Sequence, residues 1–274
     1  MSAINLYGQG IAIVKVRHVA AGVVASSLAA LAVPIVQGAL VGFTNRPDVP
    51  GPHVVDGLFR AQGDSAEPLS IVWLGDSLAA GVGAETADAS VASLSASLYR
   101  SAHQRTVQLT CLAKAGSRAT DVLTAQVPLA LGLLSVGTVA VLLVGSNDVA
   151  TLNPQRRFRR QYRDILDALV GTGATVVAVG LPDIGSATVL AQPLRMIAGW
   201  AGRRTDAEVR RLALIHGAHY IDINCRPPVE LMPTVYLAAD NYHPNNETYR
   251  FWADRIATFL RTILALNSTG GPIR

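Results

Sequence analysis

The sequence predicts an α/β fold, in which a mostly parallel sheet of about five strands is covered by helices on both faces as a three-layer α/β/α sandwich. Short runs rich in β-branched residues alternate about five times with segments of helical periodicity. One such run, TVAVLLV at residues 138–144, is apolar without alternation, which is typical of a strand buried on both faces of a parallel sheet. A chain of 274 residues is long enough to form one such domain.

Each strand is expected where an apolar run is bounded by turn residues, and each helix where apolar residues recur at intervals of three and four. The expected strands cover residues 70–74, 107–112, 138–144, 175–179 and 219–223. The expected helices cover residues 87–101, 119–131, 153–169, 205–216 and 244–266. The last helix is supported by Trp252, Ile256, Phe259, Leu260 and Ile263, which can bury one face.

The first 67 residues differ in composition from the rest of the chain. Residues 19–45 contain no charged residue and are long enough to cross a membrane as a helix, and Lys15 and Arg17 before them favour export of the following chain. A cleavable signal peptide and a buried soluble helix are the alternatives. We expect residues 1–44 to be a membrane anchor or signal segment, residues 45–67 a linker and residues 68–274 the globular domain. This domain is then expected outside the cytoplasm, either membrane-anchored or secreted.

Charge, cysteine and glycine patterns argue against several classes of function. The net charge is +4, and the arginines of RRFRRQYR at 156–163 are expected to form one solvated helix face, so we expect no nucleic-acid partner. Cys111 and Cys225 have no spacing suited to zinc and are expected to be free thiols, so no metal site is predicted. Gly81 and Gly83 lack the rest of a dinucleotide or phosphate-loop motif, so no cofactor is expected.

Five residues are expected at the edge of the sheet where the strands end, which is where ligands bind in such folds. Ser77, Gly116 and Asn147 follow the first three expected strands, and Asp240 and His243 precede the last helix. His243 can take the proton of Ser77 as the hydroxyl attacks a carbonyl, and Asp240 can hold the other ring nitrogen. The backbone N–H groups of Ser77 and Gly116 and the Asn147 side-chain amide can bind the oxygen that becomes negative.

Some residues in and around this set also have a simpler, structural interpretation when they are taken alone. Ser77 is a favoured helix N-cap, and Gly116 can serve a turn that needs a positive φ. Pro244 is expected at the first position of the last helix. Asp76 and Asp148 are expected to accept hydrogen bonds from backbone amides in their turns rather than to act as acids.

Four motifs occur in order: Gly75-Asp76-Ser77-Leu78, Gly116 within AKAGSRATD, Gly145-Ser146-Asn147-Asp148 and Asp240-Asn241-Tyr242-His243-Pro244. Together they resemble the motif blocks of the GDSL, or SGNH, hydrolases over residues 68–266. The resemblance implies a flavodoxin-like fold, Ser77 as nucleophile, Gly116 and Asn147 as oxyanion donors, and Asp240 with His243 as the rest of the triad. The chain departs from the family at Lys114, where Asn is common, and this puts the local turn in doubt.

The motifs and the resemblance predict a serine esterase without a cofactor. It would hydrolyse small-molecule or lipid esters of short to medium acyl chains through an acyl-enzyme, with thioesterase or lipase activity open. One alternative is an O-acyltransferase or carbohydrate deacetylase acting on cell-envelope glycans, which the outward-facing anchor suggests. The other is a membrane-tethered binding protein with an inactive hydrolase fold. The sequence does not indicate the oligomeric state.

Overall fold

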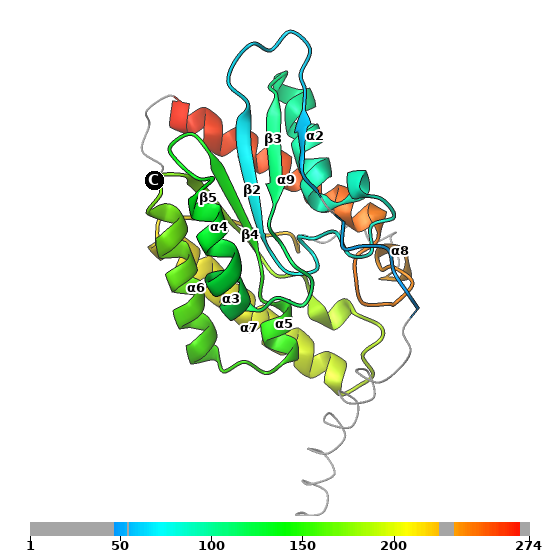
Figure 1. Ribbon diagram of the computed structural model, residues 1–274. Helices are drawn as coiled ribbons and strands as arrows, with labels where there is room; N and C mark the ends of the chain where they lie inside the picture. The colour runs from blue at the N-terminus through cyan, green and yellow to red at the C-terminus, as the bar shows by residue number, and fades with distance from the viewer. Residues whose placement is uncertain (1–46, 54, 225–232, 269–274) are drawn as a thin grey trace, which may run out of the picture. The chain divides into compact units, whose positions relative to one another are not determined.

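The computed structural model describes residues 47–53, 55–224 and 233–268 (Figure 1). One compact unit, Arg46–Val189 with Arg195–Arg274, contains the whole sheet and every candidate site residue, and the second comprises Met1–Asn45 with Leu190–Leu194. Residues 19–45 and Cys225 lie outside the described residues, so the anchor, the domain boundaries and the location outside the cytoplasm stay predictions. Among the described helices, none is long and apolar enough to cross a membrane.

A six-stranded sheet in the order β1-β3-β2-β4-β5-β6 forms the centre of the larger unit. The strands are β1 (Gly57–Phe59), β2 (Leu69–Gly75), β3 (Val107–Cys111), β4 (Val139–Leu143), β5 (Thr175–Val179) and β6 (His219–Ile221). Strands β2 to β6 are parallel, and β1 is antiparallel to β3. The predicted sheet is therefore confirmed, with β1 as an additional edge strand inside the range expected to be a linker.

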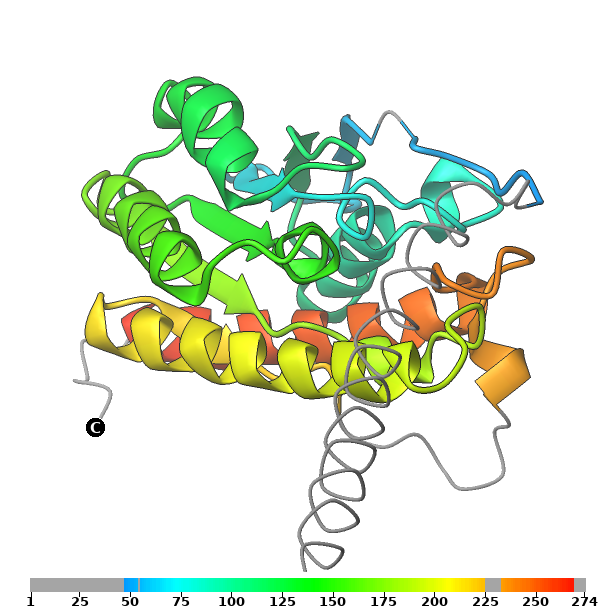
Figure 2. The ribbon, with the colours of Figure 1, turned by 90° about the horizontal axis from the view of Figure 1, so that it is seen from below.

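Helices cover both faces of this sheet, as predicted. They are η1 (Ala87–Ala89), α2 (Val91–His103), α3 (Ala119–Asp121), η2 (Val122–Gln126), α4 (Val127–Leu131), α5 (Ser146–Ala150), α6 (Gln155–Val170), η3 (Ile184–Ser186), α7 (Leu194–Ile215), α8 (Pro233–Tyr236) and α9 (Asn246–Ser268). Figure 1 shows α3, α4 and α6 in front of the sheet and α9 behind it, and the turned view of Figure 2 agrees. The predicted three-layer sandwich is confirmed.

Burial on both faces explains why the central strands are apolar without alternation. Ile71 and Trp73 of β2 pack in one core cluster with residues of α2 and α9. Val72 and Leu74, which point to the other face, are fully buried as well. Each large side chain buried in this way contributes roughly 1.5–3 kcal/mol to folding. The central strands therefore hold the site residues on a rigid support.

Several helix boundaries differ from the prediction. The helix expected at 205–216 begins at Leu194, and the helix expected at 119–131 contains a π-helical stretch, η2. Pro244 is not the first residue of the last helix: it pairs with Leu237 in a β-bridge. Helix α9 begins at Asn246, and the Asn245 side chain caps it by accepting a hydrogen bond from Thr248 N–H at 3.1 Å.

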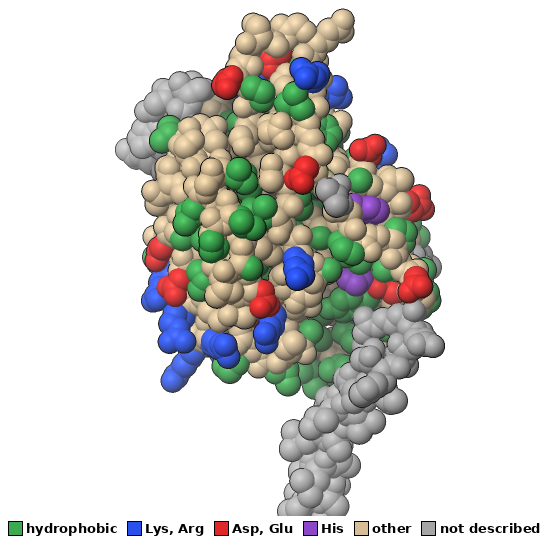
Figure 3. All heavy atoms as spheres, viewed as in Figure 1, with side chains coloured by type: hydrophobic (Ala, Val, Ile, Leu, Met, Phe, Trp, Pro, Cys, Tyr) green, Lys and Arg blue, Asp and Glu red, His purple; other side chains and the backbone are tan. Residues whose placement is uncertain are grey.

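The arginine-rich segment is confirmed as a solvated helix face on α6. Its five arginines, Arg156, Arg157, Arg159, Arg160 and Arg163, are exposed, whereas Phe158 and Tyr162 are buried beneath them. Figure 3 shows basic side chains gathered over this helix. Arg159 also forms a salt bridge with Glu208 of α7 at 2.7 Å, which links α6 to α7.

Candidate active site

The predicted residues meet where the strand order of the sheet reverses. Strands β2 and β4 are neighbours, but the chain crosses from β2 to β3 on one side and from β4 to β5 on the other. In open α/β sheets, the crevice at the carboxyl ends of two such strands is the usual ligand site. Ser77 follows β2, and Asn147 follows β4 near the start of α5. Both residues therefore lie at this crevice.

The turn after β2 presents Ser77 through a dense set of backbone contacts. Gly75 has φ +152°, and a Cβ there would clash with the carbonyl oxygen of Leu143, so the position requires glycine. Asp76 N–H donates to Leu143 O at 3.1 Å, and Val82 N–H donates to Ser77 O at 2.9 Å. Ser77 is 9% exposed. Its hydroxyl faces His243 rather than capping a helix.

Asp76 lies in this turn and accepts a hydrogen bond from a backbone amide, as the sequence predicted. Its Oδ1 accepts a hydrogen bond from Leu78 N–H at 3.0 Å. Burial raises the pKa of Asp76 to about 7, and the nearby Asp148 carboxylate adds to the rise. Within the described residues, Asp76 Oδ2 is buried without a hydrogen-bond partner. Neutral Asp76 is therefore favoured up to near-neutral pH.

Asp240, His243 and Ser77 form one chain of hydrogen bonds. Asp240 Oδ2 lies 2.6 Å from His243 Nδ1, and His243 Nε2 lies 3.2 Å from Ser77 Oγ. Asp240 Oδ1 accepts the backbone N–H groups of Tyr242 and His243, each at 3.0 Å. Burial acts to raise the pKa of Asp240, but the hydrogen bonds from His243 and Tyr242 outweigh it and lower the pKa. Asp240 is therefore ionised at neutral pH and held in one orientation.

The segment that carries His243 folds back on itself before α9. Leu237 pairs with Pro244 in an antiparallel bridge, and Ala238 N–H donates to His243 O at 2.8 Å. The Tyr242 ring meets the His243 ring edge-on, with centroids 5.1 Å apart. These contacts restrict the movement of the imidazole. Such restriction is what a general base needs in order to stay directed at its nucleophile.

Gly83 is a supporting residue whose role the sequence did not reveal. It has φ +95°, and a Cβ there would clash with Pro244 O and lie 3.1 Å from His243 Cβ. Glycine at this position lets the loop that follows Ser77 approach the His243 segment. The glycine pair at 81 and 83 was the available signal, but sequence alone could not say what approaches it.

Gly116 and Asn147 lie on segments that are connected to the end of β2. Gly116 has φ +82° in a turn that is closed by a 3.1 Å hydrogen bond from Ser117 N–H to Lys114 O. Lys114 N–H donates to Gly75 O at 3.2 Å, and the Lys114 side chain is exposed. The Asn147 amide donates to Ser117 O at 3.1 Å. The turn therefore forms in spite of the unusual Lys114.

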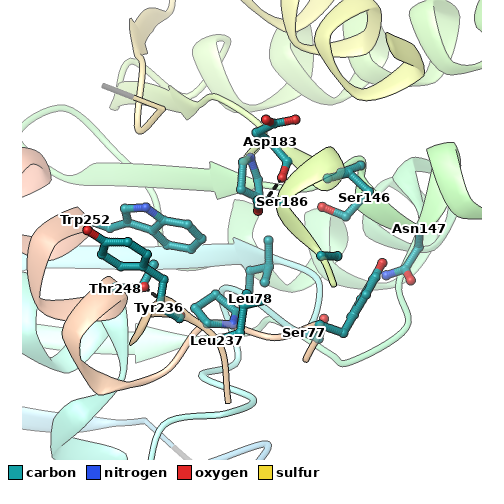
Figure 4. Close-up of a pocket in the computed structure, with 15 residues that line it drawn as sticks. Ser77, Leu78, Ser146, Asn147, Asp183, Ser186, Tyr236, Leu237, Thr248 and Trp252 are labelled. Atoms are coloured by element: carbon teal, nitrogen blue, oxygen red, sulfur yellow. Dashed lines mark hydrogen bonds between the residues drawn. The ribbon is translucent and has the colours of Figure 1, made fainter. Parts of the chain in front are cut away.

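Ser77 and Asn147 line a cleft of about 600 Å³ that is open to solvent. Figure 4 shows Ser77 and Asn147 at one end and Tyr236 and Trp252 at the other, with Leu78 between them. Most other lining residues are apolar or aromatic, among them Pro182, Ile184, Leu237, Tyr242 and Pro244. Asp183 and Ser186 add polar groups. Gly116 does not line the cleft itself.

Comparison with known proteins identifies the family. The model of the GDSL-like lipase/acylhydrolase family matches residues 73–251. The chain belongs to this family. A GDSL-like esterase of Mycobacterium tuberculosis is 31% identical over 127 residues, which are 46% of this chain and 40% of the relative. The match thus spans less than half of the length of that relative.

Three solved structures, one of them a lipolytic protein of the G-D-S-L family, share the fold of this GDSL-like hydrolase. A lipolytic protein of Veillonella parvula is 17% identical, with a TM-score of 0.55 over 71% of this chain and 98% of its own. A lipase from a goat rumen metagenome is also 17% identical, with a TM-score of 0.57 over 69% and 96% of the two chains. A psychrotrophic esterase of Pseudoalteromonas is 14% identical, with a TM-score of 0.55 over 72% and 98%.

Asp148 and Cys111 of this GDSL-like hydrolase do not belong to the Asp240–His243–Ser77 chain of hydrogen bonds. Asp148 is buried and accepts hydrogen bonds from Ala119 N–H at 2.9 Å and from the Asn153 amide at 2.6 Å, as expected for a structural carboxylate. Cys111 is a free cysteine in the described part of the chain, and burial raises its pKa to about 11, which disfavours a reactive thiolate. No group of three or more potential metal ligands occurs among the described side chains.

Proposed function

We propose that the protein is a serine esterase in which Ser77 is the nucleophile, His243 the general base and Asp240 the residue that orients His243. The observation that carries the proposal is the continuous contact from Asp240 Oδ2 through His243 to Ser77 Oγ, with distances of 2.6 and 3.2 Å. A serine hydroxyl needs such a base to become a nucleophile at neutral pH. Membership in a family of ester-hydrolysing enzymes supports the same assignment.

In the first half of the proposed reaction, Ser77 Oγ attacks the ester carbonyl carbon while His243 Nε2 takes the hydroxyl proton. The carbonyl oxygen becomes an oxyanion, which the N–H groups of Ser77 and Gly116 and the Asn147 amide would bind. Asp240 stabilises the imidazolium without taking its proton. His243 then gives the proton to the departing alkoxide, and the acyl group remains on Ser77. Each oxyanion donor of this kind lowers the barrier by about 2.7–4 kcal/mol.

In the second half, a water molecule takes the place of the alcohol. His243 Nε2 accepts a proton from this water as its oxygen attacks the acyl-enzyme, and the same oxyanion donors stabilise the second tetrahedral intermediate. The C–O bond to Ser77 then breaks, His243 returns the proton to Ser77 Oγ, and the carboxylic acid leaves. The cycle needs no cofactor.

The cleft supports an ester with a short to medium acyl chain as the substrate. The cleft is open to solvent and is lined mainly by apolar and aromatic side chains with a few polar groups, as is typical of sites for small organic ligands. The apolar wall that runs from Leu78 toward Trp252 suits an alkyl chain better than a charged group (Figure 4). We propose small-molecule or lipid esters as the substrate class.

The test is hydrolysis of para-nitrophenyl esters from acetate to laurate by the full chain, with Ser77→Ala alongside. We expect Ser77-dependent turnover that is highest for short or medium chains and falls toward laurate. Ser77→Ala should keep the far-UV circular dichroism of the wild type, because it removes only one side-chain hydrogen bond. Turnover that persists in Ser77→Ala would contradict the proposed nucleophile.

A further inference from the structure

A buried glutamine, Gln126, contacts the segments that carry the proposed oxyanion donors, although it is not in any of the four motifs. The residue is only 4% exposed. Its Oε1 accepts the Gly75 N–H at 2.8 Å, and its Nε2 donates to Gly75 O at 2.8 Å and to Ser117 Oγ at 3.2 Å. Exchanging the amide O and N would oppose like groups at both Gly75 atoms, so the amide has one favoured orientation.

The first link holds the end of β2. Strand β2 pairs with β3 only as far as Trp73 opposite Cys111, whereas its pairing with β4 continues to Gly75 opposite Leu143. Gly75 thus extends past the paired part of β3, and an unpaired buried N–H is costly. The Gln126 amide bonds both backbone groups of Gly75: it supplies the acceptor for Gly75 N–H that β3 does not provide, and it shares Gly75 O with the N–H of Lys114. It thereby fixes the backbone two residues before Ser77.

The second link reaches the other two donors. Ser117 is 5% exposed and follows Gly116 in the turn. Its Oγ accepts from Gln126, and its carbonyl oxygen accepts from the Asn147 amide at 3.1 Å. A buried chain of hydrogen bonds therefore runs from Gly75 through Gln126 and Ser117 to Asn147. It connects all three segments that carry oxyanion donors.

Gln126 lies in a π-helical stretch, and its buried neighbours there are apolar. Gln126 ends the π-helical stretch Val122–Gln126, in which Val127 N–H bonds to Val122 O. Its buried neighbours in this stretch and in α4 are the apolar residues Val122, Val127 and Ala130. π-Helical turns are frequent at functional sites, and a buried amide among apolar residues must be fully hydrogen-bonded to be tolerated.

We propose that Gln126, acting through Gly75 and Ser117, is a positioning residue that sets the spacing of the Ser77, Gly116 and Asn147 donors. The inference rests on the proposed function. Oxyanion donors must lie about 2.7–3.1 Å from the developing charge, and a shift of about 1 Å can cost roughly 10²-fold in rate. Gln126 itself does not line the cleft.

The main test is Gln126→Met, which keeps the length of the side chain and removes its hydrogen bonds. We expect kcat for para-nitrophenyl butyrate to fall by about 10- to 100-fold, with KM within about threefold of wild type. The rate of labelling of Ser77 by a fluorophosphonate should fall in parallel, because the phosphonyl oxygen uses the same donors. Gln161→Met is the matched control: Gln161 is also buried, but its amide contacts Asn153 on the α6 side. Its kcat should stay within about threefold of wild type.

Two further variants separate positioning from general packing. In Gln126→Glu, a carboxylate would oppose Gly75 O, whereas the protonated acid can donate to it as the amide does. The ratio of its kcat to that of wild type should therefore rise as the pH falls from 8 to 5.5. Ser117→Ala removes the Ser117 Oγ contact but keeps the carbonyl bond to Asn147, so we expect a smaller loss of about 3- to 10-fold.

Wild-type kcat and labelling in a folded Gln126→Met protein would overturn the inference, as would a rise in KM alone. If Gln126→Met does not fold, the other two variants decide: a pH-independent ratio for Gln126→Glu together with wild-type kcat in Ser117→Ala would overturn it. Failure of the proposed function is recognised separately, because wild-type protein would then show no turnover and no labelling that depend on Ser77. In that case the inference falls with it.

Discussion

Asp240→Asn should disable the enzyme through the tautomer of His243, without disturbing the fold. Asp240 Oδ1 accepts two backbone N–H groups, from Tyr242 and His243, while Oδ2 faces His243 Nδ1. An Asn side chain would keep its oxygen on the two backbone donors and turn its NH₂ toward Nδ1. His243 would then carry its proton on Nε2, which faces Ser77 and could no longer act as a base.

The size of the effect follows from these contacts. Restoring the active tautomer would require the Asn amide to flip, which leaves two partly buried N–H donors unpaired at about 1–3 kcal/mol each. Together the two donors cost about 2–6 kcal/mol, which predicts a fall in kcat of about 30-fold to about 10⁴-fold; the upper value is the loss typical of a triad trapped in the wrong tautomer. KM should change little, because the substitution leaves the cleft unaltered.

The assay is steady-state hydrolysis of para-nitrophenyl acetate, with Asp167→Asn as the control. Asp167 pairs with His216 Nδ1 at the same 2.6 Å distance, but this pair joins α6 to the end of α7 on the surface. We expect wild-type kcat in Asp167→Asn. A kcat within tenfold of wild type in Asp240→Asn would refute the assignment of Asp240.

Three other predictions concern neighbouring groups. Asn147→Ala should lower kcat by roughly 10²-fold with little change in KM, as measured in the same assay. Because burial raises the pKa of Asp76 to about 7, folded protein holds a proton that unfolded protein releases near pH 4, so stability falls as the pH rises from about 4 to 7. Asp76→Asn should remove this loss, of which roughly 3 kcal/mol falls between pH 5 and 8, and urea unfolding at these two pH values would show it. Gly83→Ala should displace His243 and lower both kcat and the thermal midpoint, since a Cβ there clashes with Pro244 O.

The parts of the fold that could be predicted are those with a strong local pattern. The range 175–179 was predicted with the bounds that β5 has, because its β-branched run stands between glycine-rich turns. Strand β1 was missed because three residues that are half exposed or exposed carry no periodic signal. Helix α7 was predicted too short because Gly199 and Gly202 interrupt its pattern. The structure explains both glycines, since they pack against Gly185 and Ile184.

The candidate site divides in the same way. Two of the site residues, Ser77 and Asn147, come just after strands, and the Asp240–His243 segment comes just before the last helix. Their convergence could therefore be predicted from the order of the elements. Gln126 could not be predicted, because its partners are 51 and 9 residues away along the chain. Only the three-dimensional structure shows that this buried amide is hydrogen-bonded to Gly75 and Ser117 at the site.

The central claim is that Ser77 is a nucleophile activated by His243. Its most direct test is intact and peptide mass spectrometry after the full chain is treated with a fluorophosphonate, with His243→Ala and Ser77→Ala treated in parallel. The account predicts a single phosphonyl adduct on the peptide that contains Ser77, formed far more slowly in His243→Ala and absent in Ser77→Ala. An adduct on another residue, or equal labelling of His243→Ala and wild type, would contradict it.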